Sequence, residues 1–177
     1  YYFPYTSKQH PSTNVPDMND GKPGDYLTNA LTDKAIKFIE QQGEKPFFLN
    51  IWYYTVHTPI MPNKAKLEKY RKKAKAMGLD IQDKRGKDGI KDHQSMSRSV
   101  QSNESYAFMV ESMDENIGRI LETLKRLKLE QDTIVVFLSD NGGLSTGPGP
   151  NMPTSNLPLR TGCFVGRLLG RKQTFAC

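Results

Sequence analysis

The sequence lacks both features that commonly place a chain in a membrane or mark it for export. It contains no run of 18 or more apolar residues, so we expect no membrane-spanning helix. Its opening residues, 1–5, have neither the basic start nor the apolar core of a signal peptide. With 177 residues and 36% hydrophobic content, the chain is expected to form one globular domain.

Cysteine is scarce, and both cysteines lie close to the C-terminus. Cys163 and Cys177 provide neither a disulfide framework nor the paired spacing of a zinc site. The two cysteines therefore do not indicate in which cellular compartment the protein resides. Histidine is also rare: His10 and His93 lie in polar, irregular segments, and we assign neither a role.

Acidic residues are outnumbered, and the imbalance is local. Residues 64–98 hold 12 basic and 5 acidic side chains, whereas the whole chain has a net charge of +6. Such a segment either forms a solvated surface or attracts an anionic substrate. No aromatic residue other than Tyr70 interleaves the basic residues, so we expect no nucleic-acid binding.

Helical spacing alternates with buried-strand patterns along the chain. Apolar residues recur at helical spacing from Leu27 to Ile39, and Gly43 ends that run. A longer amphipathic helix is predicted over 106–127, opened by Ser102 or Asn103. A basic helix is predicted over 64–77, with Gly78 as its C-cap and four apolar residues on one face: Leu67, Tyr70, Ala74 and Met77. Residues 80–103 are predicted to form a surface loop.

The most informative stretch is 133–143, Thr-Ile-Val-Val-Phe-Leu-Ser-Asp-Asn-Gly-Gly. An apolar run of this kind is typical of a buried parallel strand, and ligands of α/β sheets gather at the carboxyl ends of such strands. Asp140 and Asn141 stand at that end with hard oxygen ligands suited to calcium or magnesium. Gly142 and Gly143 permit a tight turn. Taken alone, a strand followed by an Asx turn explains the pattern equally well.

A second strand pattern covers residues 47–53 and is followed by His57. An imidazole therefore also falls just beyond a predicted strand. Taken alone, His57 reads as an ordinary loop histidine.

These motifs occur in an order that resembles the formylglycine-dependent sulfatases, the arylsulfatase family of the alkaline-phosphatase-like superfamily. The motifs are Lys45-Pro46 before the first strand, Val56-His57-Thr58-Pro59 after it, the helix over 106–121, Asp140-Asn141, and the segment 154–160. The resemblance runs from about Tyr26 to Arg160. It implies an α/β fold, namely part of an alkaline-phosphatase-like three-layer sandwich with a mostly parallel sheet.

The resemblance also implies roles for three residues. Asp140 and Asn141 would be two ligands of a divalent cation, most often Ca²⁺. His57 would contact the sulfate or donate a proton to the leaving alkoxide. In that family a cysteine oxidised to formylglycine supplies, as its hydrate, the oxygen that attacks sulfur.

Several family motifs are missing from this chain. The nucleophile motif Cys-x-Pro-Ser-Arg, an early Asp pair and a Gly-Lys-x-His segment do not occur, so we expect an internal fragment of the catalytic domain. Cys163 stands where the family has a sulfate-binding lysine, and it is not the nucleophile because Val165 replaces the required Pro or Ala. Residues 1–160 are thus interpreted as a partial catalytic domain. Residues 161–177 form a tail unlike the family, consistent with a frameshift.

The predicted function is part of a sulfuric ester hydrolase that acts on a sulfated carbohydrate or aryl ester. We expect this chain to be inactive alone, because the formylglycine precursor is absent. Two alternatives remain open: a phosphoesterase of the same superfamily, and a non-catalytic remnant that binds sulfated polyanions through residues 64–98. Export to the periplasm or medium, or a lysosomal location, follows from the resemblance only.

Overall fold

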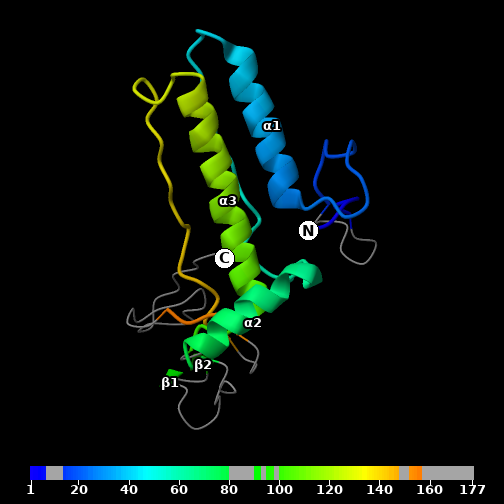
Figure 1. The fold of residues 1–177 in the computed structure, drawn as a ribbon, viewed down its shortest axis with the longest axis vertical. Coiled ribbons are helices and arrows are strands. Elements are labelled where there is room, and N and C mark those ends of the chain that lie inside the picture. The colour runs from blue at the N-terminus through cyan, green and yellow to red at the C-terminus, as the bar shows by residue number, and fades with distance from the viewer. Residues whose placement is uncertain (7–13, 80–89, 93–94, 98–99, 148–151, 157–177) are drawn as a thin grey trace, which may run out of the picture. The chain divides into compact units, whose positions relative to one another are not determined.

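The chain folds into two compact units in a computed structural model (Figure 1). The model describes residues 1–6, 14–79, 90–92, 95–97, 100–147 and 152–156. The first unit comprises Tyr1–Met61 and Met109–Val135, and the second comprises Pro62–Phe108 and Val136–Cys177. Predictions about His10, His93, both cysteines and the tail 161–177 lie outside the described residues.

The first unit is built on two helices that the sequence predicts. Helix α1 spans Leu27–Gln42 and stops at Gly43, whose φ of 60° favours glycine. It buries the side chains of Leu27, Thr28, Thr32, Ala35 and Ile39. Helix α3 spans Glu104–Arg126, and the Asn103 side chain accepts a hydrogen bond from the backbone N–H of Tyr106 at 3.0 Å. Asn103 is therefore the N-terminal cap, as one of the two predicted candidates.

A ladder of polar contacts shows that α1 and α3 run parallel in the first unit. Three residues of α1 meet three of α3 in the same chain order: Asn29 with Asn116, Asp33 with Arg119, and Glu40 with Arg126. Parallel neighbouring helices are what alternating helix–strand units produce when the strands between them are also parallel. The helix arrangement thus agrees with an α/β architecture.

Residues 47–55 run back along α1 with the two-residue alternation of a strand. Phe47 stacks edge-on against Phe38, the Tyr53 and Thr32 hydroxyls lie 2.7 Å apart, and those of Thr55 and Thr28 lie 2.5 Å apart. The odd-numbered residues of this segment are at least half-buried, whereas 48, 50, 52 and 54 are exposed. One face of the segment therefore packs on the helix and the other carries exposed aromatic rings.

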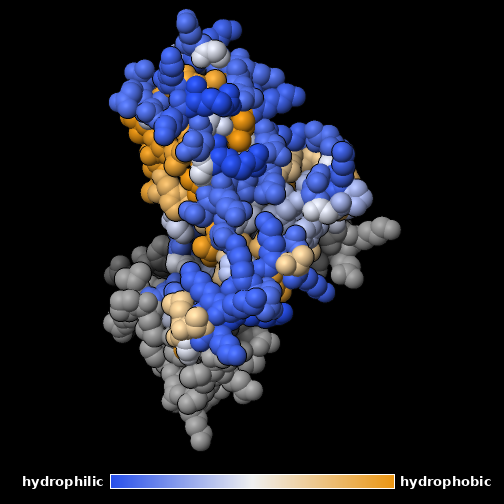
Figure 2. Space-filling model, in the orientation of Figure 1, coloured by the Kyte–Doolittle hydropathy of each residue, from blue (hydrophilic) through white to orange (hydrophobic). Residues whose placement is uncertain are grey.

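The predicted parallel sheet is not formed within the described residues, and that expectation is corrected here. Segments 47–53 and 133–138 have no strand partner among them, and apolar side chains on one face of the first segment and along the second are exposed. Phe48 is 88% exposed, Trp52 79% and Ile134 92%. Orange apolar surface is accordingly visible on the outside of the molecule (Figure 2). The physical reason is that a buried parallel strand needs neighbouring strands and a second helical layer.

The second unit contains a short turn, helix α2, the first residues of α3 and a small sheet. A 3₁₀ turn, η2, covers Lys64–Lys66, and helix α2 follows over Leu67–Ala76. Strands β1 (Ile90–Asp92), β2 (Ser95–Ser97) and β3 (Thr146–Gly147) form an antiparallel sheet in the order β1-β2-β3. Strands β1 and β2 correct the prediction that 80–103 is entirely loop.

The basic helix is confirmed with one correction to its apolar face. Leu67 is buried and Tyr70 and Ala74 are half-buried, as predicted, and Gly78 has a φ of 67°. Met77, at the C-terminal end of the helix, is 59% exposed and does not join that face.

The predicted apolar stripe of α3 is also only partly buried. Leu124 is buried, but Val110 and Leu121 are exposed. The side of α3 that meets α1 carries polar Asn116 and Arg119 instead, so the apolar face points elsewhere. Among the described residues, no helix combines the length and apolar character needed to cross a membrane.

Candidate functional site

His57 lies in the first unit, in an exposed loop directly after the helix-packed segment 47–55. Its backbone N–H donates to the carbonyl of Tyr54 at 3.1 Å, which closes a turn. Its Nδ1 lies 3.0 Å from the carbonyl oxygen of Thr58 and 3.2 Å from the Thr58 hydroxyl. When Nδ1 carries the proton and donates to that carbonyl, Nε2 is the nitrogen left to meet another group.

The His57 turn is held from outside by Tyr1. The Tyr1 hydroxyl lies 2.8 Å from the carbonyl oxygen of Tyr54 and 3.0 Å from that of His57. Burial, with a smaller contribution from Tyr54, raises the pKa of the Tyr1 phenol to about 12. The phenol therefore stays protonated and able to donate across the physiological range.

Asp140 and Asn141 lie in the second unit, where the apolar run 133–138 ends. Asp140 is exposed and Asn141 is half-buried. The Ser139 hydroxyl donates to the Asn141 carbonyl at 2.6 Å, which turns the chain sharply at this point. A carboxylate and a carboxamide thus follow the end of the run, although the run itself has no strand partner among the described residues.

Asn156 clamps the chain just beyond this pair. Its side-chain oxygen accepts from the Gly143 N–H at 3.1 Å, and its Nδ2 donates to the Gly143 carbonyl at 2.7 Å. The same Nδ2 lies 2.8 Å from the buried Ser145 hydroxyl. One carboxamide therefore satisfies both backbone groups of Gly143. Segment 154–156 is itself anchored where Gln101 donates to the Ser155 carbonyl at 2.7 Å.

Gly143 is required for space. A Cβ at this position would lie 2.8 Å from Thr154 Cγ2 and 3.2 Å from both Asn156 Oδ1 and the Tyr106 hydroxyl. Thr154 is buried and β-branched, so its methyl group has little freedom to move away. The sequence predicted Gly143 for its turn conformation, whereas the structure requires it for close packing.

Sequence reasoning placed Asn156 in a motif but gave it no role. Its contacts with Gly143 and Ser145 join segments 11 to 13 residues apart, and no local pattern encodes them. The available signal was the composition of Thr154-Ser155-Asn156, a group of short polar side chains that commonly bond to backbone.

The donor chemistry of Asp140 and Asn141 fits a hard divalent cation, but only as part of a coordination shell. Calcium takes about six to eight oxygen ligands. In the part of the chain that the structure describes, no group of three or more His, Cys, Asp or Glu residues is arranged to hold a metal ion. His57 belongs to the first unit and the Asp140-Asn141 pair to the second.

Helix–strand units with polar residues at strand ends define a class of α/β enzymes that bind ligands at the edge of a sheet. Comparison with known proteins specifies the family. The sulfatase family model matches residues 1–163, and the chain belongs to the sulfatase family. The match begins at residue 1, whereas the resemblance seen in the sequence begins at about Tyr26.

Two relatives illustrate the match. A sulfatase of Formosa agariphila is 31% identical over 157 residues, covering 83% of this chain and 23% of the relative. Human steryl-sulfatase is 31% identical over 118 residues, covering 67% of this chain and 15% of the relative. The chain spans 15–27% of the length of the curated relatives it matches, so it is a partial sulfatase catalytic domain.

Solved structures agree with the fold assignment. Ps i-CgsB superposes with a TM-score of 0.56 at 26% identity, covering 86% of this chain and 28% of that one. A second structure shows Ps i-CgsB in complex with k-i-k-neocarrahexaose, with a TM-score of 0.55 at 27% identity, covering 92% of this chain and 33% of that one.

Proposed function

We propose that this chain supplies part of the active site of a sulfuric ester hydrolase, with Asp140 and Asn141 as cation ligands and His57 facing the sulfate. The observation that carries the proposal is the Asp140-Asn141 pair at the end of an apolar run, in a loop clamped by Asn156, within a chain of the sulfatase family. Residues 1–160 are the partial catalytic domain. The family model extends to residue 163, three residues into the segment 161–177 that the sequence sets apart.

The chemistry of these residues suits sulfate ester hydrolysis. A calcium ion held partly by Asp140 and Asn141 would offset negative charge on the sulfate oxygens. His57 is suited to protonate the departing alcohol oxygen, because an imidazolium N–H is a proton donor and Nε2 is not the nitrogen that faces Thr58. The formylglycine precursor motif that the family resemblance implies does not occur in this sequence.

A sulfated carbohydrate is the proposed substrate class, with an aryl sulfate as a surrogate. Support comes from the solved relative that was crystallised with neocarrahexaose. Phosphate esters are the competing class within the superfamily, and the assay below separates the two.

The test is a chimera in which residues 26–160 replace the matching segment of the Formosa agariphila sulfatase. We expect the chimera to hydrolyse an aryl sulfate in preference to the corresponding aryl phosphate. His57→Ala should lower kcat by about 10²- to 10⁴-fold, the usual contribution of a general acid. Asp140→Ala should abolish activity, whereas Asp132→Ala, an exposed acid in the preceding turn, should change it less than twofold.

A folded chimera in which Asp140→Ala and Asp132→Ala are equally active would refute the site assignment. Preference for the phosphate ester would instead favour the phosphoesterase reading. Circular dichroism of each variant separates loss of the fold from loss of chemistry.

A further inference from the structure

The surplus positive charge of the chain is confined to η2 and α2. Residues 64–75 hold seven of the 25 basic residues and one of the 19 acidic residues, so the remaining sequence carries 18 of each sign. The net charge of +6 is therefore the charge of this one element. The family motifs of this chain lie outside this element, and the sequence links it to sulfated polyanions only in the non-catalytic alternative.

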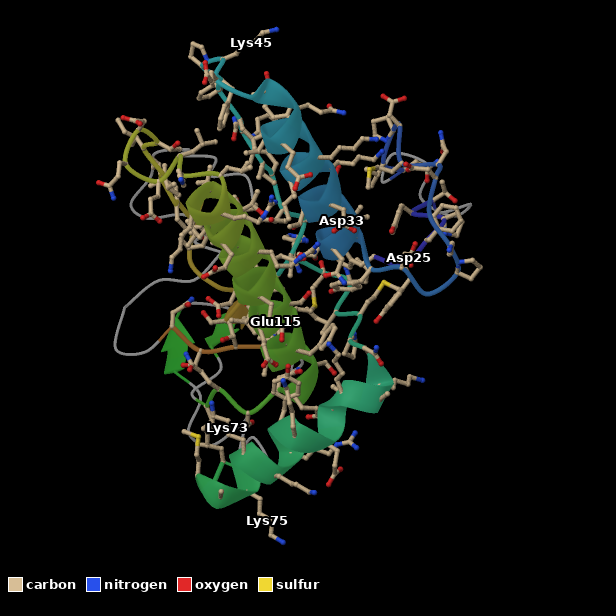
Figure 3. All side chains as sticks on the ribbon, turned by 45° about the horizontal axis from the view of Figure 1, so that its top comes forward. Asp25, Asp33, Lys45, Lys73, Lys75 and Glu115 are labelled. Atoms are coloured by element: carbon tan, nitrogen blue, oxygen red, sulfur yellow. The ribbon has the colours of Figure 1, made fainter. Side chains whose placement is uncertain are left out.

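Three lysines of this element form a stripe on a face beside the buried one. Leu67, Tyr70 and Ala74 mark the buried side, whereas Lys66, Lys69 and Lys73 are exposed and follow each other at spacings of three and four residues. Residues at such spacings share one helix face, and at 1.5 Å per residue the stripe extends about 10 Å along the axis. Lys72 flanks it, and the Lys75 side chain extends away from α2 in Figure 3.

The helix that carries the stripe is fixed at both ends. The Asn63 side chain accepts from the Ala65 N–H at 3.0 Å, and the Gly78 N–H donates to the Lys75 carbonyl at 3.0 Å. Arg71 pairs with Glu104 at 3.4 Å within the second unit. The guanidinium is thus used to anchor α2. The side chains of Lys66, Lys69 and Lys73 are exposed, and the Lys69 ammonium group lies 5.0 Å from the centroid of the Tyr70 ring.

We propose that η2 and α2 form a binding surface for the sulfate groups of a sulfated polysaccharide, separate from the ester that is cleaved. This inference rests on the proposed function, because it assigns that enzyme a polymeric, multiply sulfated substrate. A row of ammonium groups matches a row of sulfates along a flexible chain, since each ammonium acts as a strongly hydrated point charge without a fixed binding direction. Binding here would hold the polymer to the unit that also contains Asp140 and Asn141.

The chemistry of the stripe favours a sulfated glycan over a nucleic acid. Single-stranded nucleic acids are held by exposed aromatic platforms together with arginine. The stripe residues are lysines, the nearby ring of Tyr70 is half-buried, and the arginine of the helix is engaged by Glu104.

The test measures binding of the intact chain to a sulfated carrageenan oligosaccharide at several salt concentrations, with no hydrolysis required. The stripe variant is Lys66→Gln/Lys69→Gln/Lys73→Gln. The matched control is Lys37→Gln/Lys45→Gln/Lys125→Gln, which removes the same charge from exposed lysines of the first unit. Lysine and glutamine have similar helix propensities, so α2 should persist, and circular dichroism checks this.

We expect the stripe variant to bind at least tenfold more weakly at about 0.1 M salt. The slope of the logarithm of the binding constant against the logarithm of the salt concentration should become shallower by about two to three. The control variant should bind within about twofold of the parent. The desulfated form of the same oligosaccharide should not bind.

Three results would overturn the inference: equal weakening by both triple variants, no binding of the sulfated oligosaccharide, or duplex DNA bound as tightly as the glycan and lost with the stripe. The last would indicate a nucleic-acid surface. Failure of this test leaves the hydrolase proposal intact, because the chimera assay uses a small aryl ester. An inactive chimera combined with stripe-dependent glycan binding would reject the hydrolase alone.

Discussion

At the scale of single residues, the candidate site depends on groups that hold the functional side chains in place. Tyr1 holds the His57 turn through two backbone carbonyls, and Asn156 holds the chain that follows Asn141. Neither residue needs to touch substrate. Each is a positioning residue, and each makes a contact that a single substitution removes.

The Tyr1 contact predicts a defined pH dependence. The pKa of the phenol is raised from an ordinary value near 10 to about 12, so its contribution is complete below about pH 10 and is lost as the pH rises through about 12. The contribution is lost at high pH, rather than at low pH, because only the neutral phenol donates to the Tyr54 and His57 carbonyls.

Carbon-13 NMR of labelled tyrosine measures this pKa directly, with the Tyr1 resonance assigned by its absence from a Tyr1→Phe variant. The His57 ring resonances should shift over the same pH interval in the parent and stay unchanged over it in the variant. A Tyr1 midpoint near 10 would contradict the burial of this phenol.

The Asn156 clamp predicts a local loss of protection. Asn156→Ala leaves the N–H and carbonyl of Gly143 without this partner, which should cost about 1 to 3 kcal/mol of local stability. Amide exchange of Gly143 should accelerate by roughly 5- to 150-fold. Asn50→Ala, at an exposed asparagine, is the control, and an unchanged Gly143 rate in Asn156→Ala would contradict the clamp.

At the scale of elements, helices and strands differ in how far the sequence predicts them. Helices α1 and α3 follow from spacing and from local stop and start signals, Gly43 and Asn103, which act within a few residues. The strand at 47–53 shows the right alternation but no ladder, because pairing depends on partners far away in sequence or outside it. The role of Asn156 was not predicted for the same reason, because its hydrogen-bond partners are not local in sequence.

The exposed face of segment 47–55 predicts self-association. Phe48 and Trp52 project from an extended segment without a strand partner among the described residues, which is the pattern of an aggregation-prone edge. Phe48→Ser/Trp52→Ser should lower the sedimentation-detected oligomer fraction and the binding of an apolar dye. Because neither ring packs on α1, circular dichroism should keep its helical signal.

The control replaces two rings that do pack in the first unit, with Phe38→Ser/Phe47→Ser. That pair should lower the helical signal and increase association. If the Phe48→Ser/Trp52→Ser variant associates as strongly as the parent, the exposed face is not the cause.

At the scale of the whole molecule, the chain spans only part of the length of the sulfatases and solved structures that it matches. It spans 23% of the Formosa agariphila enzyme and 28% of the Ps i-CgsB chain. A site assembled from several strand ends loses most of its activity when its nucleophile is absent. We therefore predict that the isolated chain does not hydrolyse an aryl sulfate above the rate of the uncatalysed reaction.

The surrounding gene tests the same prediction without an assay. Sequencing on both sides of this reading frame should find Cys-x-Pro-Ser-Arg upstream and, in another frame downstream, Gly-Lys followed by Glu-Gly-Gly. Measurable turnover by the isolated chain, or a locus with neither motif, would contradict the assignment of this chain as part of a larger hydrolase.

The central claim is that Asp140 and Asn141 hold a divalent cation, and metal content tests it most directly. Calcium bound per molecule would be measured by mass spectrometry in the purified chimera and in its Asp140→Ala/Asn141→Ala variant, with Asp132→Ala as the control. We predict about one calcium per molecule in the chimera and the control, and a loss of at least tenfold in the double variant, as expected when hard oxygen ligands are removed. Stoichiometric calcium in a folded double variant would contradict the account.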